Sequence, residues 1–456
     1  MTDRRSAREF LALVTDDFTE LPHPEGLAAP DGPLGWPGYD AARARAAERT
    51  GEEESVVCGT GHVAGVRAVL VAFEFGFLGG SLGRRTGDRL EAAYAYARAH
   101  RLPVVPLVAT GGSRMQEGML ALTQLQRVAR ESALTREAGL AQIAVVRDPA
   151  TGGGWATLGA GADVILALPG AQVGFAGSRV RPPDADPSAY TAEAQVAAGS
   201  ADAVVPADEL RGTLGRWLRL LTAPSGDPAP VPGPLGARDL PATGWDAVRR
   251  ARAPGRPRAG AYLDAYFTHR VALFGDRCGG TDPDGMLCGF GEHAGRTVAY
   301  AAQTGTATGP AGYRTATRLI RLAERLGIPV LTLVDTPGAA NDAAAERQGV
   351  GAAIAELFAV MASVRTPVTT LVIGEGGSGG ALALAAPGRT WATPDSYFSV
   401  IAPELAAAIL KRGPAEVETT ADQLRLRPQD LAELGVIRTG DQMFPGTGDR
   451  RSGERM

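Results

Sequence analysis

Residues 368–381 read VTTLVIGEGGSGGA: an apolar, strand-like run leads into a glycine-rich turn that opens a helix of small residues. Residues 143–154, IAVVRDPATGGG, repeat this arrangement in the first half of the chain. The stretch 59–65 likewise returns at 289–295, with glycines at the same three places. The copies lie about 226 to 230 positions apart. This period is far longer than a solenoid repeat and therefore indicates a duplicated domain.

Both repeats predict the same order of elements. A hairpin-like pair of strands is followed by a helix, an apolar strand, a glycine-rich turn, a second helix, another apolar strand and a second glycine-rich turn. Such alternation is typical of an α/β fold. The helices are expected at 88–100, 116–130, 315–326 and 349–363, and we match Thr151-Gly152-Gly153 with Ser378-Gly379-Gly380. The expected organisation is an N-terminal extension (1–49), a first domain (50–222), a Pro/Gly-rich linker (223–245), a second domain (246–440) and a tail (441–456).

Composition excludes several classes of function. The chain has 456 residues, 45% of them hydrophobic and 21% charged, with a formal net charge of -4. This balance gives no reason to expect nucleic acid or an anionic membrane as a partner. Cys58, Cys278 and Cys288 are too few and too scattered for a disulfide framework or a four-ligand zinc site, so no metal is expected. Residues 1–18 do not resemble a signal peptide, and no apolar stretch is long enough to span a membrane. We therefore expect a soluble, cytoplasmic protein.

Three familiar motifs match the glycine turns only superficially. Gly376-x-Ser378-x-Gly380 fits the nucleophile elbow of hydrolases, but all five histidines precede the serine, and that fold needs one after it. Asp335-Thr336-Pro337-Gly338 resembles the D-x-x-G element of GTPases, but the P-loop that should accompany it requires Gly-Lys-Ser/Thr, and the one lysine, Lys411, lies in Leu-Lys-Arg. A dinucleotide fingerprint at 374–379 leaves too little chain to complete the fold that it needs.

Backbone N–H groups are the chemistry that remains. Each second turn follows a strand and precedes a helix, where N–H groups are unpaired and the helix dipole is positive. Glycine lets a ligand approach such a backbone closely. Two such turns suit a reaction that passes through two oxyanions, such as a thioester enolate and a urea-like enolate.

Longer motifs resemble the carboxyltransferase component of biotin-dependent acyl-CoA carboxylases, within the crotonase superfamily. The first repeat is similar to the beta subunit of bacterial acetyl-CoA carboxylase, and the second to the alpha subunit. In the first repeat the motifs are GGSRMQE (111–117), DPATGG (148–153) and GFAGSRV (174–180). In the second they are PAGYR (310–314), DTPGA (335–339), GEGGSGGA (374–381) and YFSVIAPE (397–404).

The resemblance implies two tandem crotonase-like domains and transfer of a carboxyl group from carboxybiotin to the α-carbon of an acyl-CoA such as acetyl-CoA, giving malonyl-CoA. The first domain would hold the CoA thioester and the second the biotin. Carried over by position, Gly152 and Gly153 would donate to the thioester enolate, and Gly379 and Gly380 to the ureido oxygen. Further expected substrate-binding residues are Gly111, Gly112, Ser113, Arg114, Gly177, Ser178, Arg179, Gly338, Ala339, Ala381 and Tyr397.

The resemblance also implies partners. In the family, the first domain of one protomer faces the second domain of another, so we expect a homodimer or higher homo-oligomer. Lys411 does not lie between methionines as a biotinyl-lysine would, so biotin is expected on a separate biotin carboxyl carrier protein charged by a biotin carboxylase.

Three departures from the family concern how CoA and the carrier are bound. The beta subunit's zinc ribbon is missing, the basic loop before PAGYR is shortened to 304–309, and Ala340-Asn341 replace an aromatic residue and a proline. Two other functions stay open at this point. One is decarboxylation of a malonyl thioester at the same enolate-stabilising site, and the other is a non-catalytic scaffold of a carboxylase complex.

Overall fold

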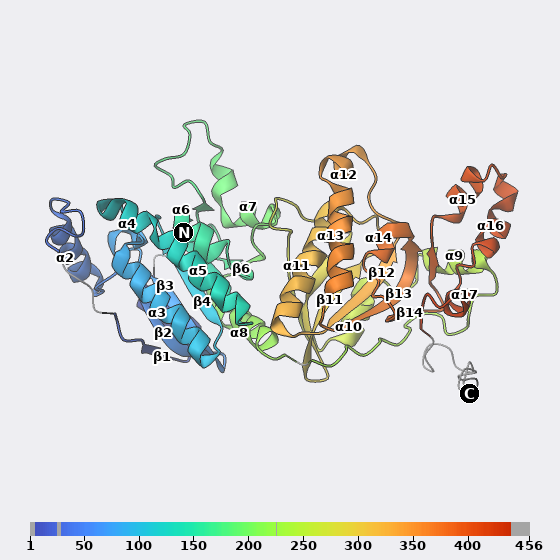
Figure 1. Cartoon of the computed structure of the whole chain (residues 1–456), viewed down its shortest axis with the longest axis horizontal. Coiled ribbons are helices and arrows are strands. Elements are labelled where there is room, and N and C mark those ends of the chain that lie inside the picture. Colours follow the sequence, from blue (N-terminus) through green and yellow to red (C-terminus); the bar gives the residue numbers. More distant parts are fainter. Residues whose placement is uncertain (1–4, 25–28, 225, 439–456) are drawn as a thin grey trace. The chain divides into compact units, whose positions relative to one another are not determined.

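The computed structural model describes residues 5–24, 29–224 and 226–438, which form two units (Figure 1). The first comprises residues 1–223 with 277–279, and the second comprises 224–276 with 280–456. Each unit is an α/β domain built on its own sheet. No helix in the described ranges combines the length and the apolar character needed to cross a membrane.

The sheet of the first unit runs in the order β1-β2-β3-β4-β5-β6-β8, with β7 paired to β5. Strands β1 to β3 are antiparallel, and the pairs from β3 onward are parallel. The central strands are buried apolar runs, as strands covered on both faces require. The strands are β1 (Asp17–Glu20), β2 (Val56–Val63), β3 (Val66–Phe73), β4 (Val104–Thr110), β5 (Ile143–Thr151), β6 (Val164–Ala167), β7 (Val173–Gly174) and β8 (Ala203–Val204).

Helices cover this sheet, with α3 and α5 packed against each other (Figure 1). Helix α3 buries Leu90, Ala93, Tyr94 and Ala97, a spacing that places all four on one face. The helices of the unit are α1 (Ala7–Val14), α2 (Tyr39–Thr50), α3 (Arg84–His100), α4 (Gly118–Leu122), α5 (Gln124–Glu137), α6 (Gly152–Gly154), α7 (Ala192–Ala197) and α8 (Ala207–Leu221).

The second unit repeats this plan. Its sheet runs β14-β13-β12-β11-β10-β9, with β15 paired to β13. The strands are β9 (His269–Ala272), β10 (Met286–His293), β11 (Arg296–Gln303), β12 (Val330–Thr336), β13 (Val368–Gly377), β14 (Thr390–Ala392) and β15 (Tyr397–Ser399). The helices are α9 (Gly244–Arg252), α10 (Ala259–Tyr266), α11 (Pro310–Leu326), α12 (Ala343–Arg347), α13 (Val350–Ser363), α14 (Ser378–Leu382), α15 (Pro403–Ile409), α16 (Val417–Gln423) and α17 (Pro428–Glu433).

Strand register confirms the duplication and corrects its alignment by one residue. In the first sheet Thr110 pairs with Ala150, and in the second Thr336 pairs with Gly376, so both positions are shifted by 226. The helices that follow begin at Gly152 and Ser378, which have the same shift. Gly152 is therefore equivalent to Ser378 and Gly153 to Gly379, whereas matching Thr151-Gly152-Gly153 with Ser378-Gly379-Gly380 was wrong.

Two other segments differ from the sequence-based expectation. The helix expected at 116–130 is divided, because Gly118 adopts a left-handed φ of 50° between a 3-10 turn and α4, and α5 then continues to Glu137. The expected linker ends two residues early, because Thr243 caps α9 by accepting from the Asp246 N–H. Helix α2 lies within the expected N-terminal extension but packs into the first unit, where the Tyr39 hydroxyl contacts Glu117.

Candidate active site

The first glycine turn is a place where two backbone segments touch. Gly112 follows β4 with a φ of 106°, and Gly152 follows β5 with a φ of 65°. A Cβ atom on Gly152 would lie 3.1 Å from the Cα atom of Gly112. Only glycine combines these left-handed conformations with so close an approach. The turns after β4 and β5 therefore present bare peptide groups side by side.

The N–H groups of this turn are not equally available. The Gly152 N–H donates to the Phe175 carbonyl at 3.0 Å, and the Gly112 N–H donates to the Thr110 hydroxyl at 3.0 Å. Gly153 is the second residue of α6, and its N–H finds no acceptor within the described part of the chain. The Gly152 N–H, which the sequence predicts as an oxyanion donor, is therefore already used in the fold. Gly153 retains a free donor.

This turn opens on a cavity of about 980 Å³ in the first unit. Its walls include six of the expected substrate-binding residues and both expected catalytic glycines of the first repeat: Gly111, Gly112, Ser113, Gly152, Gly153, Gly177, Ser178 and Arg179, together with Thr151 at the end of β5. Sequence reasoning missed Arg49, Phe75 and Gln172, which also line the cavity. Arg49 lies in the last turn of helix α2, and no motif marks it.

Arg114, which the sequence predicts as a substrate-binding residue, does not line this cavity. Its side chain is 1% exposed and forms ion pairs with Glu54, which is fully buried, and with Glu117. Its guanidinium also donates to the Tyr39 hydroxyl at 3.1 Å. Burial raises the pKa of Glu54, but the Arg114 guanidinium outweighs burial and holds the pKa below its usual range. Arg114 therefore fixes the loop that carries Gly112 from behind.

The second glycine turn presents an open donor at the equivalent place. Ser378 has a left-handed φ of 58°, as Gly152 does, and both Ser378 and Gly379 are exposed. A Cβ atom on Gly379 would meet nothing within 4 Å. The N–H of Gly379 has no acceptor among the residues that the structure describes. Gly338 lies beside this turn, and its own N–H donates to the Thr336 hydroxyl at 3.1 Å.

A buried carboxylate ties the two loops of the second turn together. Asp335, at the end of β12, is fully buried and pairs with Arg256 at 2.5 Å. The same carboxylate accepts the Glu375 N–H of β13 at 3.1 Å. One charge thus joins the strand before Gly338 to the strand before Gly379. The DTPGA motif pointed to Asp335, but no pattern in the sequence marked Arg256 as its partner.

Three other expected residues lie beneath the turn instead of at its surface. Tyr397 is 2% exposed and its hydroxyl donates to Glu375 at 2.8 Å, and Arg252 binds the same carboxylate at 2.8 Å. Ala381 is fully buried. A Cβ atom on Gly380 would lie 2.5 Å from the Ala339 nitrogen, so Gly380 is enclosed by the neighbouring loop. Tyr397 and Ala381, which the sequence predicts as substrate-binding residues, are thus packed behind the turn in this structure.

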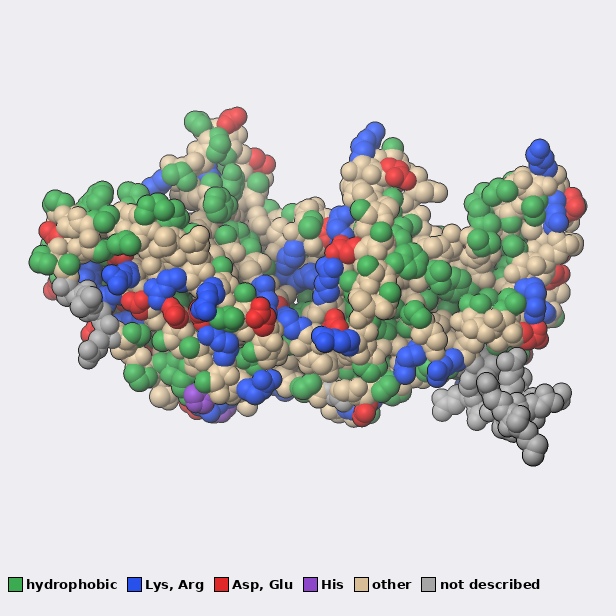
Figure 2. All heavy atoms as spheres, in the orientation of Figure 1, with side chains coloured by type: hydrophobic (Ala, Val, Ile, Leu, Met, Phe, Trp, Pro, Cys, Tyr) green, Lys and Arg blue, Asp and Glu red, His purple; other side chains and the backbone are tan. Residues whose placement is uncertain are grey.

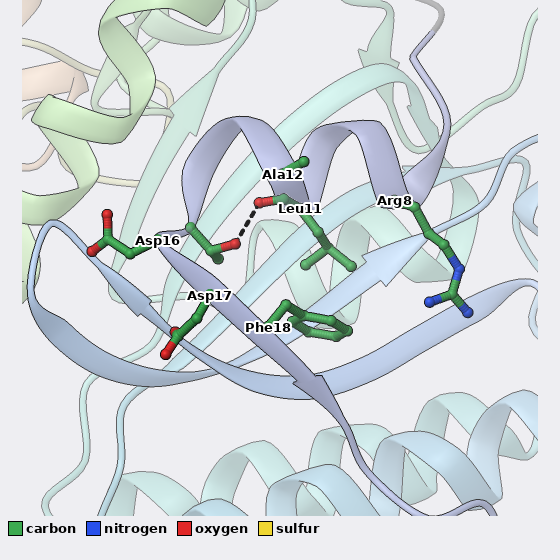
Figure 3. A pocket seen from close by; sticks show the side chains of 7 residues that line it. Arg8, Leu11, Ala12, Asp16, Asp17 and Phe18 are labelled. Carbon is green, nitrogen blue, oxygen red and sulfur yellow. Dashed lines mark hydrogen bonds between the residues drawn. The ribbon is translucent and has the colours of Figure 1, made fainter.

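A second hollow in the first unit lies beside α1 and does not compete with this site (Figure 3). Its volume is about 310 Å³, and its charged groups already have partners. Arg8 pairs with Glu20 and Glu52, Asp16 with Arg211, and Asp17 with His62. The Thr15 hydroxyl donates to the Leu11 carbonyl at 2.7 Å, the dashed line in Figure 3. No charge in this hollow is left for a ligand.

Family models match both units. Residues 36–220 match the carboxyl transferase domain, and residues 240–441 match the acetyl co-enzyme A carboxylase carboxyltransferase-like family. Together the two matches cover most of the chain.

Curated relatives extend across both units. The acetyl-coenzyme A carboxylase carboxyl transferase subunits beta/alpha of Salinispora tropica is 42% identical over 420 residues, covering 85% of this chain and 73% of that protein. Its counterpart in Saccharopolyspora erythraea is 40% identical over 418 residues, covering 88% and 73%. A probable biotin-dependent acyl-coenzyme A carboxylase beta3 subunit of Mycobacterium tuberculosis is 36% identical over 422 residues, covering 90% and 84%.

A solved structure has the same fold. A crystal structure of the transcarboxylase 12S hexamer with methylmalonyl-coenzyme A bound superimposes with a TM-score of 0.76 at 20% identity, covering 95% of this chain and 86% of that one. At this identity the likeness concerns the crotonase-like fold alone.

Proposed function

The chain belongs to the carboxyltransferases of biotin-dependent acyl-CoA carboxylases, which transfer a carboxyl group to an acyl-CoA, and we propose that its two glycine turns divide this work. The first unit, through Gly153, binds the acyl-CoA thioester. The second unit, through Gly379, binds the biotin. This assignment keeps the roles that the sequence predicts for the two domains. It assigns the oxyanion N–H donor to Gly153 alone in the first domain and to Gly379 alone in the second.

The observation that carries the proposal is the pair of open N–H groups. Gly153 and Gly379 occupy equivalent places in the two repeats, each as the second residue of a helix, and neither N–H has an acceptor in the described residues. The first helix N–H groups point toward a ligand and lie at the positive end of the helix dipole. A carbonyl oxygen that gains negative charge is stabilised there without reorganisation of the protein.

The cavity of the first unit suits an acyl-CoA. Its lining includes the bare backbone of the glycine turn, the aromatic side chains Phe75 and Phe175, and the cationic side chains Arg49 and Arg179. We assign the arginines to the CoA phosphates, because a guanidinium binds phosphate oxygens in a bidentate manner. The thioester carbonyl then lies at Gly153. Gly112 and Gly152 provide the close backbone approach that brings the carbonyl within reach of this donor.

The second turn suits the ureido group of biotin. Gly379 is exposed, the space above its Cα is open, and its N–H is free in the described structure. Carboxybiotin, delivered by a separate carrier protein that a biotin carboxylase charges, supplies the carboxyl group. This chain's residues bind both reactants and hold the two oxyanions. No side-chain base is required in this scheme, because the biotin enolate that is left when the carboxyl group departs takes the α-proton of the acyl-CoA.

A homodimer would bring the two kinds of turn together. Hydrophobic side chains gather over α4 in the first unit and over α15 in the second (Figure 2). Met115, Met119 and Phe175 are 67 to 75% exposed beside the first turn, and Val400 and Ile409 are 71% and 69% exposed in the second unit. Exposed apolar patches of this kind mark interaction surfaces. We assign the first patch to the second unit of another copy of this chain.

Carboxyl transfer in the reverse direction tests the proposal. Purified protein is given malonyl-CoA with and without free biocytin, and acetyl-CoA is measured. The proposal expects acetyl-CoA formation that depends on biocytin. Equal rates without biocytin would indicate a decarboxylase, and no turnover with a well-folded protein would indicate a scaffold.

A further inference from the structure

The carbonyl of Gly380 is held by two buried side chains. The amide nitrogen Nε2 of Gln303 donates to it at 3.1 Å, and so does the hydroxyl of Tyr313, also at 3.1 Å. Gln303 ends β11 and Tyr313 lies in the first turn of α11. Both side chains are fully buried. Burial raises the pKa of Tyr313, so its hydroxyl keeps the proton that it donates.

These two bonds replace a helical one. A helix carbonyl normally accepts the N–H four residues on, as the Gly379 carbonyl accepts the Ala383 N–H at 3.0 Å. The next N–H, that of Leu384, instead donates to Ala381 at 3.2 Å. The Gly380 carbonyl is thereby left for Gln303 and Tyr313. Side chains from outside the helix therefore set the orientation of the peptide group between Gly380 and Ala381, one residue beyond Gly379.

The turn needs such support because its backbone is strained and the helix that follows is short. Ser378 holds a left-handed φ of 58°, which non-glycine residues rarely adopt. Helix α14 has only five residues. A Cβ atom on Gly380 would lie 2.6 Å from the Tyr313 hydroxyl and 2.5 Å from the Ala339 nitrogen, so the α-carbon is clamped between them.

Gln303 also carries a cost that suggests function. Its Oε1 atom is buried without a hydrogen-bond partner in the described structure. An unsatisfied buried acceptor is unfavourable, and an apolar side chain would avoid this cost. A local rule is broken mainly where function requires it. Here the gain is the Nε2 donor, which reaches Gly380 and, at 3.3 Å, the Thr308 hydroxyl.

The first repeat lacks this support. Helices α3 and α11 both have 17 residues, so Tyr313 is equivalent to Gly87. Strands β3 and β11 both have eight residues, so Gln303 is equivalent to Phe73. Neither Gly87 nor Phe73 has a side-chain donor. The difference between the two turns therefore lies behind them, in the residues that hold the backbone.

We propose that Gln303 and Tyr313 are positioning residues that set the direction of the Gly379 N–H toward biotin. The inference rests on the proposed function of the second turn. It assigns to these two side chains a role in biotin binding and turnover and none in acyl-CoA binding. It also predicts that the segment after Ser378 becomes more mobile when either donor is removed.

The test uses Tyr313→Phe, with Gln303→Met as a second variant if the first folds poorly. Tyr94→Phe is the matched control, because Tyr94 is a buried tyrosine in α3 whose hydroxyl reaches Gln142 at 3.5 Å, in the other unit. Loss of one hydrogen bond is expected to weaken biocytin binding and to lower biocytin-dependent turnover by about five- to tenfold. The KM for malonyl-CoA should stay unchanged. Amide hydrogen exchange in 378–384 should accelerate in both variants and not in the control.

Two results would overturn the inference while leaving the proposed function intact. One is unchanged hydrogen exchange and unchanged biocytin affinity in the folded variants of an active protein. The other is an equal rise in the KM for malonyl-CoA. Wild-type protein that neither binds biocytin nor transfers the carboxyl group would instead overturn the proposed function, and the role toward biotin with it.

Discussion

Replacing Gly379 by proline removes one backbone N–H from the second glycine turn and nothing from the first. The donor has no acceptor within the described structure, so no helix bond is lost with it. Removal of one oxyanion donor typically lowers turnover by about 100- to 1000-fold, which corresponds to roughly 2.7 to 4 kcal/mol of transition-state stabilisation. Gly379→Pro is therefore expected to reduce biocytin-dependent carboxyl transfer by this factor.

Gly379→Ala is the matched control. It adds a Cβ atom at the same place but keeps the N–H, and that atom would meet nothing within 4 Å of the protein. Alanine should therefore retain most of the turnover that proline loses. Gly380 is unsuitable for this test, because its Cβ would lie 2.5 Å from the Ala339 nitrogen. Gly153 is unsuitable as well, because its Cβ would lie 2.3 Å from the Leu125 side chain.

Both variants are assayed with malonyl-CoA and biocytin, and malonyl-CoA binding is measured by calorimetry. Thermal melts are needed, because Ser378 has a left-handed φ and proline restricts the residue before it. The affinity for malonyl-CoA should be the same in both variants. The reasoning is refuted if a folded Gly379→Pro protein keeps full biocytin-dependent turnover, or if alanine and proline are equally inactive.

Four further outcomes are expected. Arg114→Met should destabilise the first unit by about 3 to 5 kcal/mol in chemical denaturation, because it leaves Glu54 buried without its counter-ion. The control is Arg127→Met, which breaks the ion pairs of a side chain that is 37% exposed. It should lower the free energy of unfolding by about 1 kcal/mol or less. The pKa of Glu54 is lower in the folded protein than in the unfolded chain, where it is about 4.3. The contribution of Glu54 to the free energy of unfolding is therefore present above the unfolded pKa and is lost as the pH falls through the folded pKa. A wild-type stability profile that shows no such loss in acid would contradict this. Arg179→Ala should raise the KM for malonyl-CoA by about tenfold with little change in kcat, and an unchanged KM would remove Arg179 from the CoA site. Met119→Asp should prevent formation of the proposed homodimer, so that light scattering reports monomers, since it places a charge in the apolar patch over α4.

The sequence predicted the fold closely where hydrophobic pattern and turn chemistry agree. The helix expected at 349–363 is α13 (Val350–Ser363), and the helix expected at 315–326 is the last three turns of α11. The helix expected at 116–130 was wrong because Gly118 takes a left-handed conformation that an amphipathic pattern does not reveal. The alignment of the two turns was off by one, because similar glycine runs can be matched in two registers and only the strand pairing distinguishes them.

The sequence located both glycine turns but did not show which of their N–H groups have acceptors within the fold. The glycine runs marked both turns, since glycine is required where two backbones touch. Which N–H is free depends on distant acceptors: Gly152 donates to Phe175, 23 positions further along the chain. Arg114 and Tyr397 belong to the family motifs, but in the structure each binds a buried glutamate and holds a loop in place. The sequence does not show where these glutamates lie in the fold.

The two repeats have the same backbone fold, but different side chains hold their glycine turns in place. The position of Asp335 is taken in the first repeat by Ala109, which is nearly fully buried and carries no charge. The first turn is thus held by an arginine bound to Glu54, on the loop after β4, and the second by Asp335, on the strand itself. A buried ion pair is no reliable gain in stability, but removing one partner is costly, so each network fixes one arrangement of its loop. Because different networks hold the two glycine turns, a substitution in one network can alter the geometry of one turn without altering the other. Such independence would allow each turn to bind a different ligand.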